Sequence, residues 1–180
     1  MNDNVSHTIE RLYTHFLMRD VVYLVAGGLV LTVGIYAVQG CICYECVNWP
    51  FAVSFIFASY FLGYLIQNGC RMIGVVKIKH LTPSRFKDND VCMVDNFAKL
   101  VGPVGMREYE RIVFQKHIGA AIGPSCLICF VAFGFLVWAN PTRLHIATAA
   151  TFLILGIVCL TLNRKMWNVQ NKVLTDFSPD

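Results

Sequence analysis

Cysteines are the residues of this chain whose spacing best suits chemistry. Cys41, Cys43 and Cys46 lie in one short segment, and closely spaced thiols can bind a metal, exchange disulfides or close a loop. Three thiols without an obvious fourth ligand nearby do not complete a usual zinc site, so the sequence predicts no metal site. In an oxidising compartment they form a candidate disulfide, which Cys41 and Cys46 close more easily than the nearer pairs. The third thiol can then pair between subunits.

Two further spacings suit chemistry and have simpler alternatives. Cys126 and Cys129 form a C-x-x-C pair, as in thiol oxidoreductases, but Cys is also a common small apolar filler of buried helices. Arg111 and His117 are spaced R-x5-H, which resembles the R-x4–6-H motif of helical RNases of the HEPN type. An Arg and a His that anchor a helix at a membrane surface have the same spacing. No cofactor is predicted.

Long uncharged segments must position all of these residues. Of the 180 residues, 56% are hydrophobic and 14% charged, against about 25% charged in an ordinary soluble domain. Lys, Arg, Asp and Glu are absent from residues 21–38, 49–69, 118–139 and 146–162, and each segment is long enough for a transmembrane helix. The sequence therefore predicts an all-α integral membrane protein, a bundle of four transmembrane helices.

The basic residues predict its orientation. All 15 except Arg143 lie outside residues 39–48 and 140–145, and Lys and Arg concentrate in cytoplasmic segments. We therefore expect a multi-pass protein of the plasma (bacterial inner) membrane with both termini cytoplasmic. Its predicted cytosolic parts are an arm (residues 1–20), a small helical segment (70–117) and a tail (163–180), and its outer loops are residues 39–48 and 140–145.

The predicted cytosolic parts contain helices and contact sites. The arm has the pattern of an amphipathic helix, which can lie on the inner membrane surface or pack on the cytosolic segment. The sequence GPVG at residues 102–105 should break the helix before the third span. Basic residues expected to contact anionic lipid or a cytosolic protein partner are Lys77, Lys79, Arg85, Lys87, Arg107, Arg111, Arg164 and Lys165. Acidic neighbours such as Asp88 interrupt this charge, so no specific nucleic acid is expected.

Small residues predict where helices approach one another. They include the pairs Gly119-x-x-x-Gly123 and Ser59-x-x-x-Gly63, together with Gly27 and Gly28. Such residues allow close contact of membrane helices, either within one chain or in a homo-oligomer, and both remain open. Pro124 predicts a kink in the third span.

The function class follows from what the spans contain. They hold no charged or His side chain, which argues against a proton-coupled transporter and an intramembrane carboxylate or His enzyme. We expect a non-catalytic membrane protein that self-associates and acts through its cytosolic face as a scaffold or sensor subunit. Its topology is similar to that of compact four-span proteins of bacterial stress and phage-defence modules. One alternative is a small oligomeric pore that permeabilises or depolarises the membrane.

A membrane thiol oxidoreductase is the second alternative. Cys43-x-x-Cys46 in the first outer loop is similar to the arrangement of the bacterial quinone-linked disulfide-forming oxidoreductases, but those enzymes carry another cysteine pair in the second outer loop, which residues 140–145 lack. The vitamin K epoxide reductase family places its C-x-x-C near an outer helix end, whereas Cys126 and Cys129 lie well inside the third span.

Overall fold

The protein is all-helical, as predicted. A computed structural model describes residues 2–40, 48–77 and 90–176. It contains helices α1 (Asn2–Gln39), α2 (Trp49–Met72), α3 (Asp90–Ala139) and α4 (Arg143–Asp176). Each helix has a stretch long and apolar enough to cross a membrane, and these stretches are Arg19–Gln39, Trp49–Met72, Arg107–Ala139 and Arg143–Lys172. Their length and composition indicate a membrane protein.

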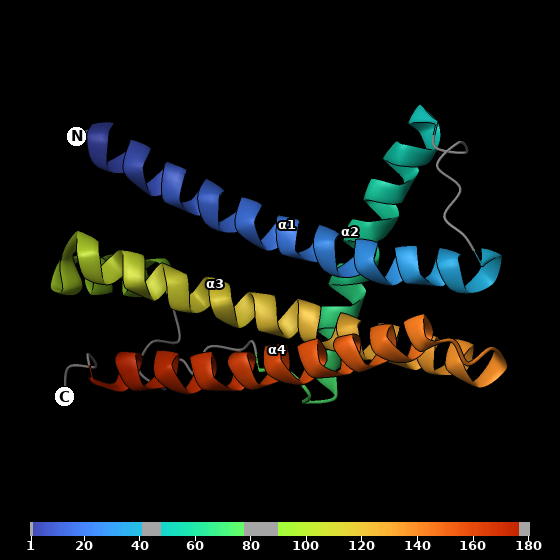
Figure 1. Ribbon diagram of the computed structural model, residues 1–180. Helices are drawn as coiled ribbons and strands as arrows, with labels where there is room; N and C mark the ends of the chain where they lie inside the picture. Colours follow the sequence, from blue (N-terminus) through green and yellow to red (C-terminus); the bar gives the residue numbers. More distant parts are fainter. Residues whose placement is uncertain (1, 41–47, 78–89, 177–180) are drawn as a thin grey trace.

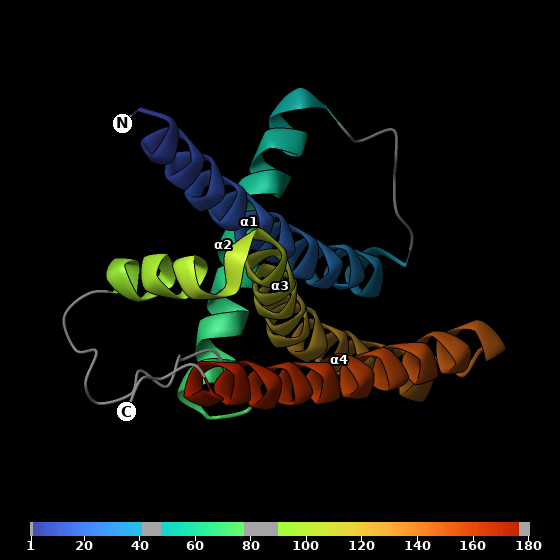
Figure 2. The ribbon, with the colours of Figure 1, turned by 90° about the vertical axis from the view of Figure 1, so that its left-hand side faces the viewer.

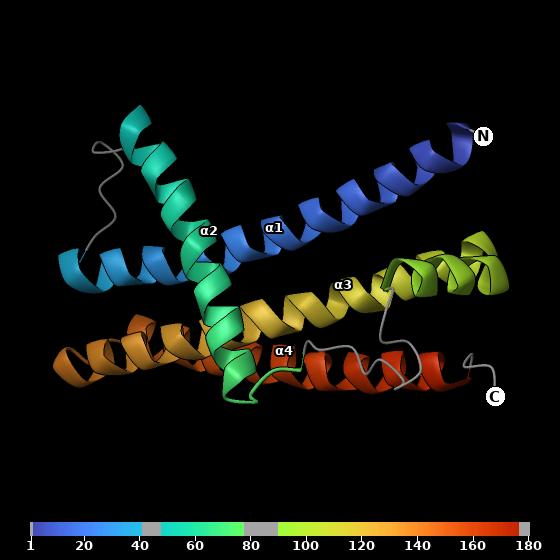
Figure 3. The ribbon, with the colours of Figure 1, turned by 180° about the vertical axis from the view of Figure 1, so that it is seen from behind.

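Three of the helices share a common direction, and the fourth crosses them (Figure 1). Helices α1 and α3 run the same way, and α4 returns antiparallel along α3 (Figure 1). Both termini therefore lie at one end of the molecule, and the connection from α3 to α4 lies at the other. Figure 3 shows α2 crossing α1 and α3 steeply instead of lying alongside them.

The crossing of α1 and α2 depends on glycine. A Cβ atom on Gly27 would overlap the carbonyl oxygen of Ser59, and one on Gly63 would overlap the carbonyl oxygen of Tyr23. The two backbones thus touch without an intervening side chain, which only glycine permits. This close contact fixes α2 against the middle of α1.

Helices α3 and α4 pair along their length through small residues. A Cβ atom on Gly119 would lie 2.8 Å from the backbone nitrogen of Asn163 and would also overlap the carbonyl oxygen of Cys159. Further along the pair, a Cβ on Gly156 would lie 2.8 Å from a methyl of Leu127. Ala120 and Ala121 of α3 are fully buried, and Ala121 packs in a cluster with Val22, Tyr23 and Ala26 of α1.

Helix boundaries follow local sequence signals. Asn48 caps α2, since its side chain accepts a hydrogen bond of 2.9 Å from the Phe51 N–H, and Pro50 occupies the first turn. Gly74, with φ of 75°, lies just after α2. Gly102, with φ of 68° and ψ of −180°, breaks α3 where GPVG predicts a break, and Figure 2 shows residues 90–101 turning away from the rest of the helix.

The predicted arm and tail continue the spans. Helix α1 runs uninterrupted from Asn2 to Gln39, so arm and first span form one helix with no turn between them. The amphipathic character of the arm stays a prediction. Helix α4 extends past the fourth predicted span to Asp176. Within α3, Gly102 is the residue with non-helical backbone angles, and Pro124 lies in the helical part.

Candidate functional site

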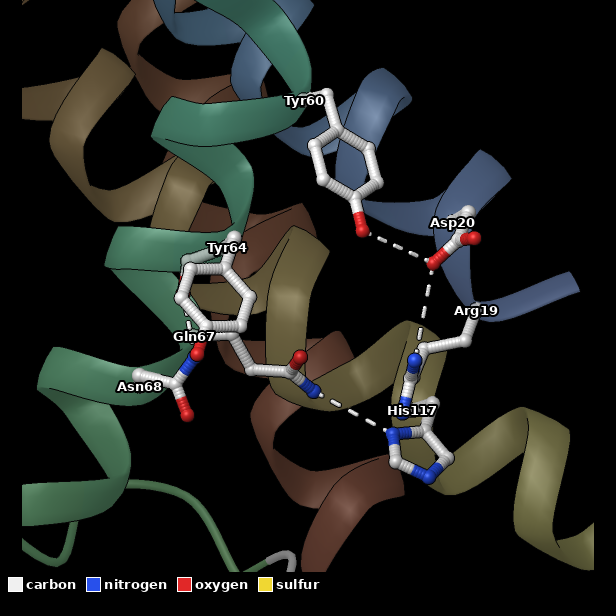
Figure 4. Close-up of polar contacts among 7 residues, drawn as sticks. All are labelled: Arg19, Asp20, Tyr60, Tyr64, Gln67, Asn68 and His117. Carbon is white, nitrogen blue, oxygen red and sulfur yellow. Dashed lines mark hydrogen bonds and ion pairs between the residues drawn. The ribbon is translucent and has the colours of Figure 1, made fainter. Parts of the chain in front are cut away.

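Two polar clusters lie on the side of the molecule that holds both termini. One, the boundary cluster, joins α1, α2 and α3 and consists of Arg19, Asp20, Tyr60, Tyr64, Gln67 and His117 (Figure 4). The other, the α3–α4 clasp, consists of Tyr109, Lys116, Asn163, Trp167 and Gln170. Neither cluster was predicted from the sequence.

The boundary cluster is built around Asp20 of α1. The Tyr60 hydroxyl donates a hydrogen bond of 3.2 Å to Asp20 Oδ1, and Arg19 Nε lies 3.8 Å from the same oxygen. Figure 4 shows both interactions converging on this carboxylate from α2 and α1.

Aromatic rings and a buried amide complete this cluster. The Tyr23 ring packs edge-on against those of Tyr60 and Tyr64, with centroids 5.8 Å apart in each pair. On the side of α3, Gln67 Nε2 lies 3.4 Å from His117 Nδ1. Gln67 is 1% exposed and Tyr23 is 6% exposed, so other parts of the protein cover the cluster on this side.

The α3–α4 clasp is a chain of buried and partly buried hydrogen bonds. Lys116 Nζ donates to Gln170 Oε1 at 2.7 Å, and Gln170 Nε2 donates to the Tyr109 hydroxyl at 2.9 Å. The ammonium also lies 5.6 Å from the centre of the Trp167 ring. Burying a charge is costly unless polar groups surround it, and here a carbonyl oxygen and an aromatic face do so.

Asn163 extends the clasp to the segment after α2. Its Nδ2 donates to the Lys116 carbonyl at 3.0 Å and to the Lys77 carbonyl at 3.2 Å, while its Oδ1 accepts from the Lys77 N–H at 3.1 Å. Lys116 and Asn163 are 0% exposed. One amide therefore holds three segments of the chain together.

A smaller polar contact lies at the opposite end. His145 Nδ1 lies 3.0 Å from the Asn140 carbonyl, and its Nε2 lies 3.3 Å from the Tyr36 hydroxyl. A carbonyl only accepts, so Nδ1 carries a proton in this contact. This contact joins α1 to the start of α4.

The predicted small-residue sites lie in contacts within the chain. Gly27, Ser59 and Gly63 meet at the α1–α2 crossing, where Gly28 faces Ser59, and Gly119 and Gly123 face α4. Pro124 is buried in α3.

The structure describes some of the predicted basic contact residues and thiols, and the others lie outside its described residues. Lys77, Arg107, Arg111, Arg164 and Lys165 are exposed. Arg111 lies 3.8 Å from Glu108, whereas His117 contacts Gln67, so the R-x5-H pair has different partners. Cys126 and Cys129 are buried free thiols. The remaining predicted residues lie outside the described part of the chain: Lys79, Arg85, Lys87, Cys41, Cys43 and Cys46.

Sequence reasoning missed the clasp, although a signal was present. Tyr109 and Lys116 are seven residues apart on α3, and Asn163 and Gln170 are seven apart on α4. Seven residues make about two helical turns, so each pair lies on one face. Polar residues repeating on one face at the end of two adjacent apolar segments indicate a shared polar contact.

In the described part of the chain, no group of three or more His, Cys, Asp or Glu side chains could hold a metal ion. The chain matches no known protein-family model, no curated protein and no solved structure.

Proposed function

We propose that the protein is a non-catalytic membrane protein that self-associates and acts through its cytosolic face as a scaffold or sensor subunit. The α3–α4 clasp is the observation that supports this proposal. The candidate membrane-spanning stretch of α3 has 33 residues and that of α4 has 30, which correspond to about 50 and 45 Å of helix. Hydrocarbon is only about 30 Å thick, so both helices extend beyond it.

The clasp lies in this extension and joins its two helices. Its hydrogen bonds join α3 and α4 just beyond the predicted third and fourth spans. A displacement of the helix pair in the bilayer is therefore transmitted to the extension. Exposed Arg107, Arg111, Arg164 and Lys165 lie on it and offer a basic surface to an acidic partner or anionic lipid.

Self-association is supported by the lateral surface of the molecule. Phe57 and Phe61 of α2 are 71% and 61% exposed, and Ile154 of α4 is 62% exposed. In a membrane, lipid or a second copy must cover these side chains. We propose that a second copy covers either the exposed face of α2 or the exposed face of α4.

Photo-cross-linking in membranes tests self-association. A photoreactive amino acid replaces Phe57 in one variant and Ile154 in another, with Ala26, which is 0% exposed, as the buried control. We expect a cross-linked dimer from one exposed position and none from the control. Monomer alone from both exposed positions would contradict self-association.

Ion flux separates the scaffold from a pore. The purified protein is reconstituted in liposomes loaded with a potassium-sensitive dye, and the cross-linked dimer is reconstituted in parallel. The scaffold proposal expects no flux above that of empty liposomes. Sustained flux in either preparation would contradict it and favour the pore alternative.

A further inference from the structure

The boundary cluster lies where lipid headgroups are expected. Asp20 directly precedes the first predicted span, and His117 directly precedes the third. Because α2 crosses α1 steeply (Figure 3), the Tyr60 hydroxyl reaches Asp20 although Tyr60 lies in the middle of its predicted span. If the chain lies in the membrane as proposed, on which this inference rests, the cluster is a polar site at the edge of the hydrocarbon.

The cluster is closed by protein on one side and open on the other. The side chains of Arg19 and Asp20 are 36% and 42% exposed, and Tyr60 and Tyr64 are 36% and 45% exposed. Buried Gln67 and Tyr23 lie behind them. Parts of both charged side chains and of both phenol rings are therefore accessible to a ligand, although Nε of Arg19 is itself buried.

Asp20 has the character of a site for a small cation. A carboxylate offers about four acceptor positions, and Asp20 Oδ1 contacts a neutral hydroxyl at 3.2 Å and a guanidinium nitrogen at 3.8 Å. An ammonium with N–H donors can bind it more closely than the neighbouring Arg19 does.

Arg19 supplies the complementary charge beside Asp20. A guanidinium has five donors and binds phosphate well. The structure thus presents a cationic and an anionic position side by side, which matches a molecule carrying a phosphate close to an ammonium. We propose that the boundary cluster binds the headgroup of a zwitterionic phospholipid with a primary ammonium, its ammonium at Asp20 and its phosphate at Arg19.

Lipid-dependent thermal stability of the purified full chain tests this site. Detergent-solubilised protein is titrated with phosphatidylethanolamine, phosphatidylcholine, phosphatidylglycerol or inorganic phosphate, and the melting temperature is recorded. We expect the largest rise with phosphatidylethanolamine, a smaller one with phosphatidylcholine, which lacks N–H donors, and little with the other two. An equal rise with phosphatidylglycerol or phosphate would overturn the ammonium assignment.

Variants connect the effect to the cluster. Asp20→Asn should raise the phosphatidylethanolamine concentration that gives half of the rise in melting temperature about tenfold or more. The reason is that it removes the charge that pairs with the ammonium. Tyr60→Phe keeps the ring and should preserve the lipid preference. Arg143→Gln, at the opposite end of the molecule, is the control. Unchanged lipid response in Asp20→Asn would overturn the proposal, as would a loss of stability that is equal with and without lipid.

Arg19→Gln serves as a second variant should Asp20→Asn fail to fold. It should weaken phosphatidylethanolamine and phosphatidylcholine alike, because both present the same phosphate. An unchanged response to both lipids would overturn the phosphate assignment. Loss of lipid selectivity with dimer cross-linking intact would sink this site alone, whereas a chain that does not partition into membranes at all would overturn both proposals.

Discussion

At the residue scale, Lys116 is the charged side chain most fully removed from solvent in the described part of the chain. It is 0% exposed and donates to Gln170 at 2.7 Å. Its four methylene groups cross the α3–α4 interface, so the ammonium reaches an amide oxygen and the Trp167 ring. Packing and polar contact thus come from the same side chain.

Replacing Lys116 should therefore weaken the helix pair. Lys116→Met keeps the apolar length and removes the donor to Gln170 Oε1, and we expect a loss of about 1–3 kcal/mol of unfolding free energy. In Gln170→Leu/Lys116→Met the loss should be smaller than the sum of the single losses by about 1 kcal/mol. Reversible unfolding in mixed micelles, followed by Trp fluorescence, measures all three variants.

The control for this cycle is Lys165→Met, which removes a charge from an exposed position of α4. Exposed charges contribute little, so its effect should stay within about 0.5 kcal/mol. Strictly additive losses in the double variant would show that Lys116 and Gln170 do not interact.

At the element scale, helix α1 has one glycine packed at the crossing with α2 and another in open space. A Cβ on Gly27 would overlap the Ser59 carbonyl, whereas one on Gly34 would meet no atom within 4 Å. Gly27→Ala should force the helices apart and cost about 1–3 kcal/mol. Gly34→Ala should stabilise α1 slightly, because alanine favours the helix more than glycine does.

The same pair can be made on α2, with Gly63→Ala as the crossing variant and Gly69→Ala as the open one. Melting temperatures in one detergent compare all four. Equal effects of Gly27→Ala and Gly34→Ala would mean that the close approach is not required.

Gly102 allows a test of backbone conformation without a packing effect. Its φ of 68° and ψ of −180° lie in a region that essentially only glycine adopts, yet a Cβ there would meet no atom within 4 Å. Gly102→Ala should cost about 1–3 kcal/mol through the backbone alone. Limited proteolysis should then show faster cleavage between residues 90 and 107, with Gly134→Ala, also in open space, as control. Unchanged cleavage in Gly102→Ala would contradict a strained break.

Much of this architecture could be predicted from the sequence, because long apolar segments and single glycines are strong local signals. The four apolar helices and the break at Gly102 follow from composition and from one residue type. The steep crossing of α2 could not be predicted, since Gly63 indicates a close approach but not its partner or angle. The clasp was missed for a related reason. In the sequence, Lys116 beside a span looks like an ordinary lysine whose side chain extends to the membrane surface. Only the register of α4 against α3 brings Gln170 opposite it.

At the scale of the whole molecule, the positions of the chain ends constrain membrane topology. Both termini lie at one end, and the turn from α3 to α4 lies at the other (Figure 1). All basic residues except Arg143 lie outside the two predicted outer loops, which favours the terminal end facing the cytoplasm. Geometry and charge thus support one orientation.

Reporter fusions test this orientation in cells. A reporter that is active only in the cytoplasm should be active at either terminus and inactive when inserted after Pro141, while a reporter active only outside should give the opposite pattern. Arg143→Gln combined with Thr142→Lys keeps the loop charge and is the control, because it should leave the pattern unchanged. Cytoplasmic activity at one terminus only would require an odd number of crossings. Because both termini lie at one end of the structure and α1 and α3 run in the same direction (Figure 1), that result would contradict the arrangement of the four helices.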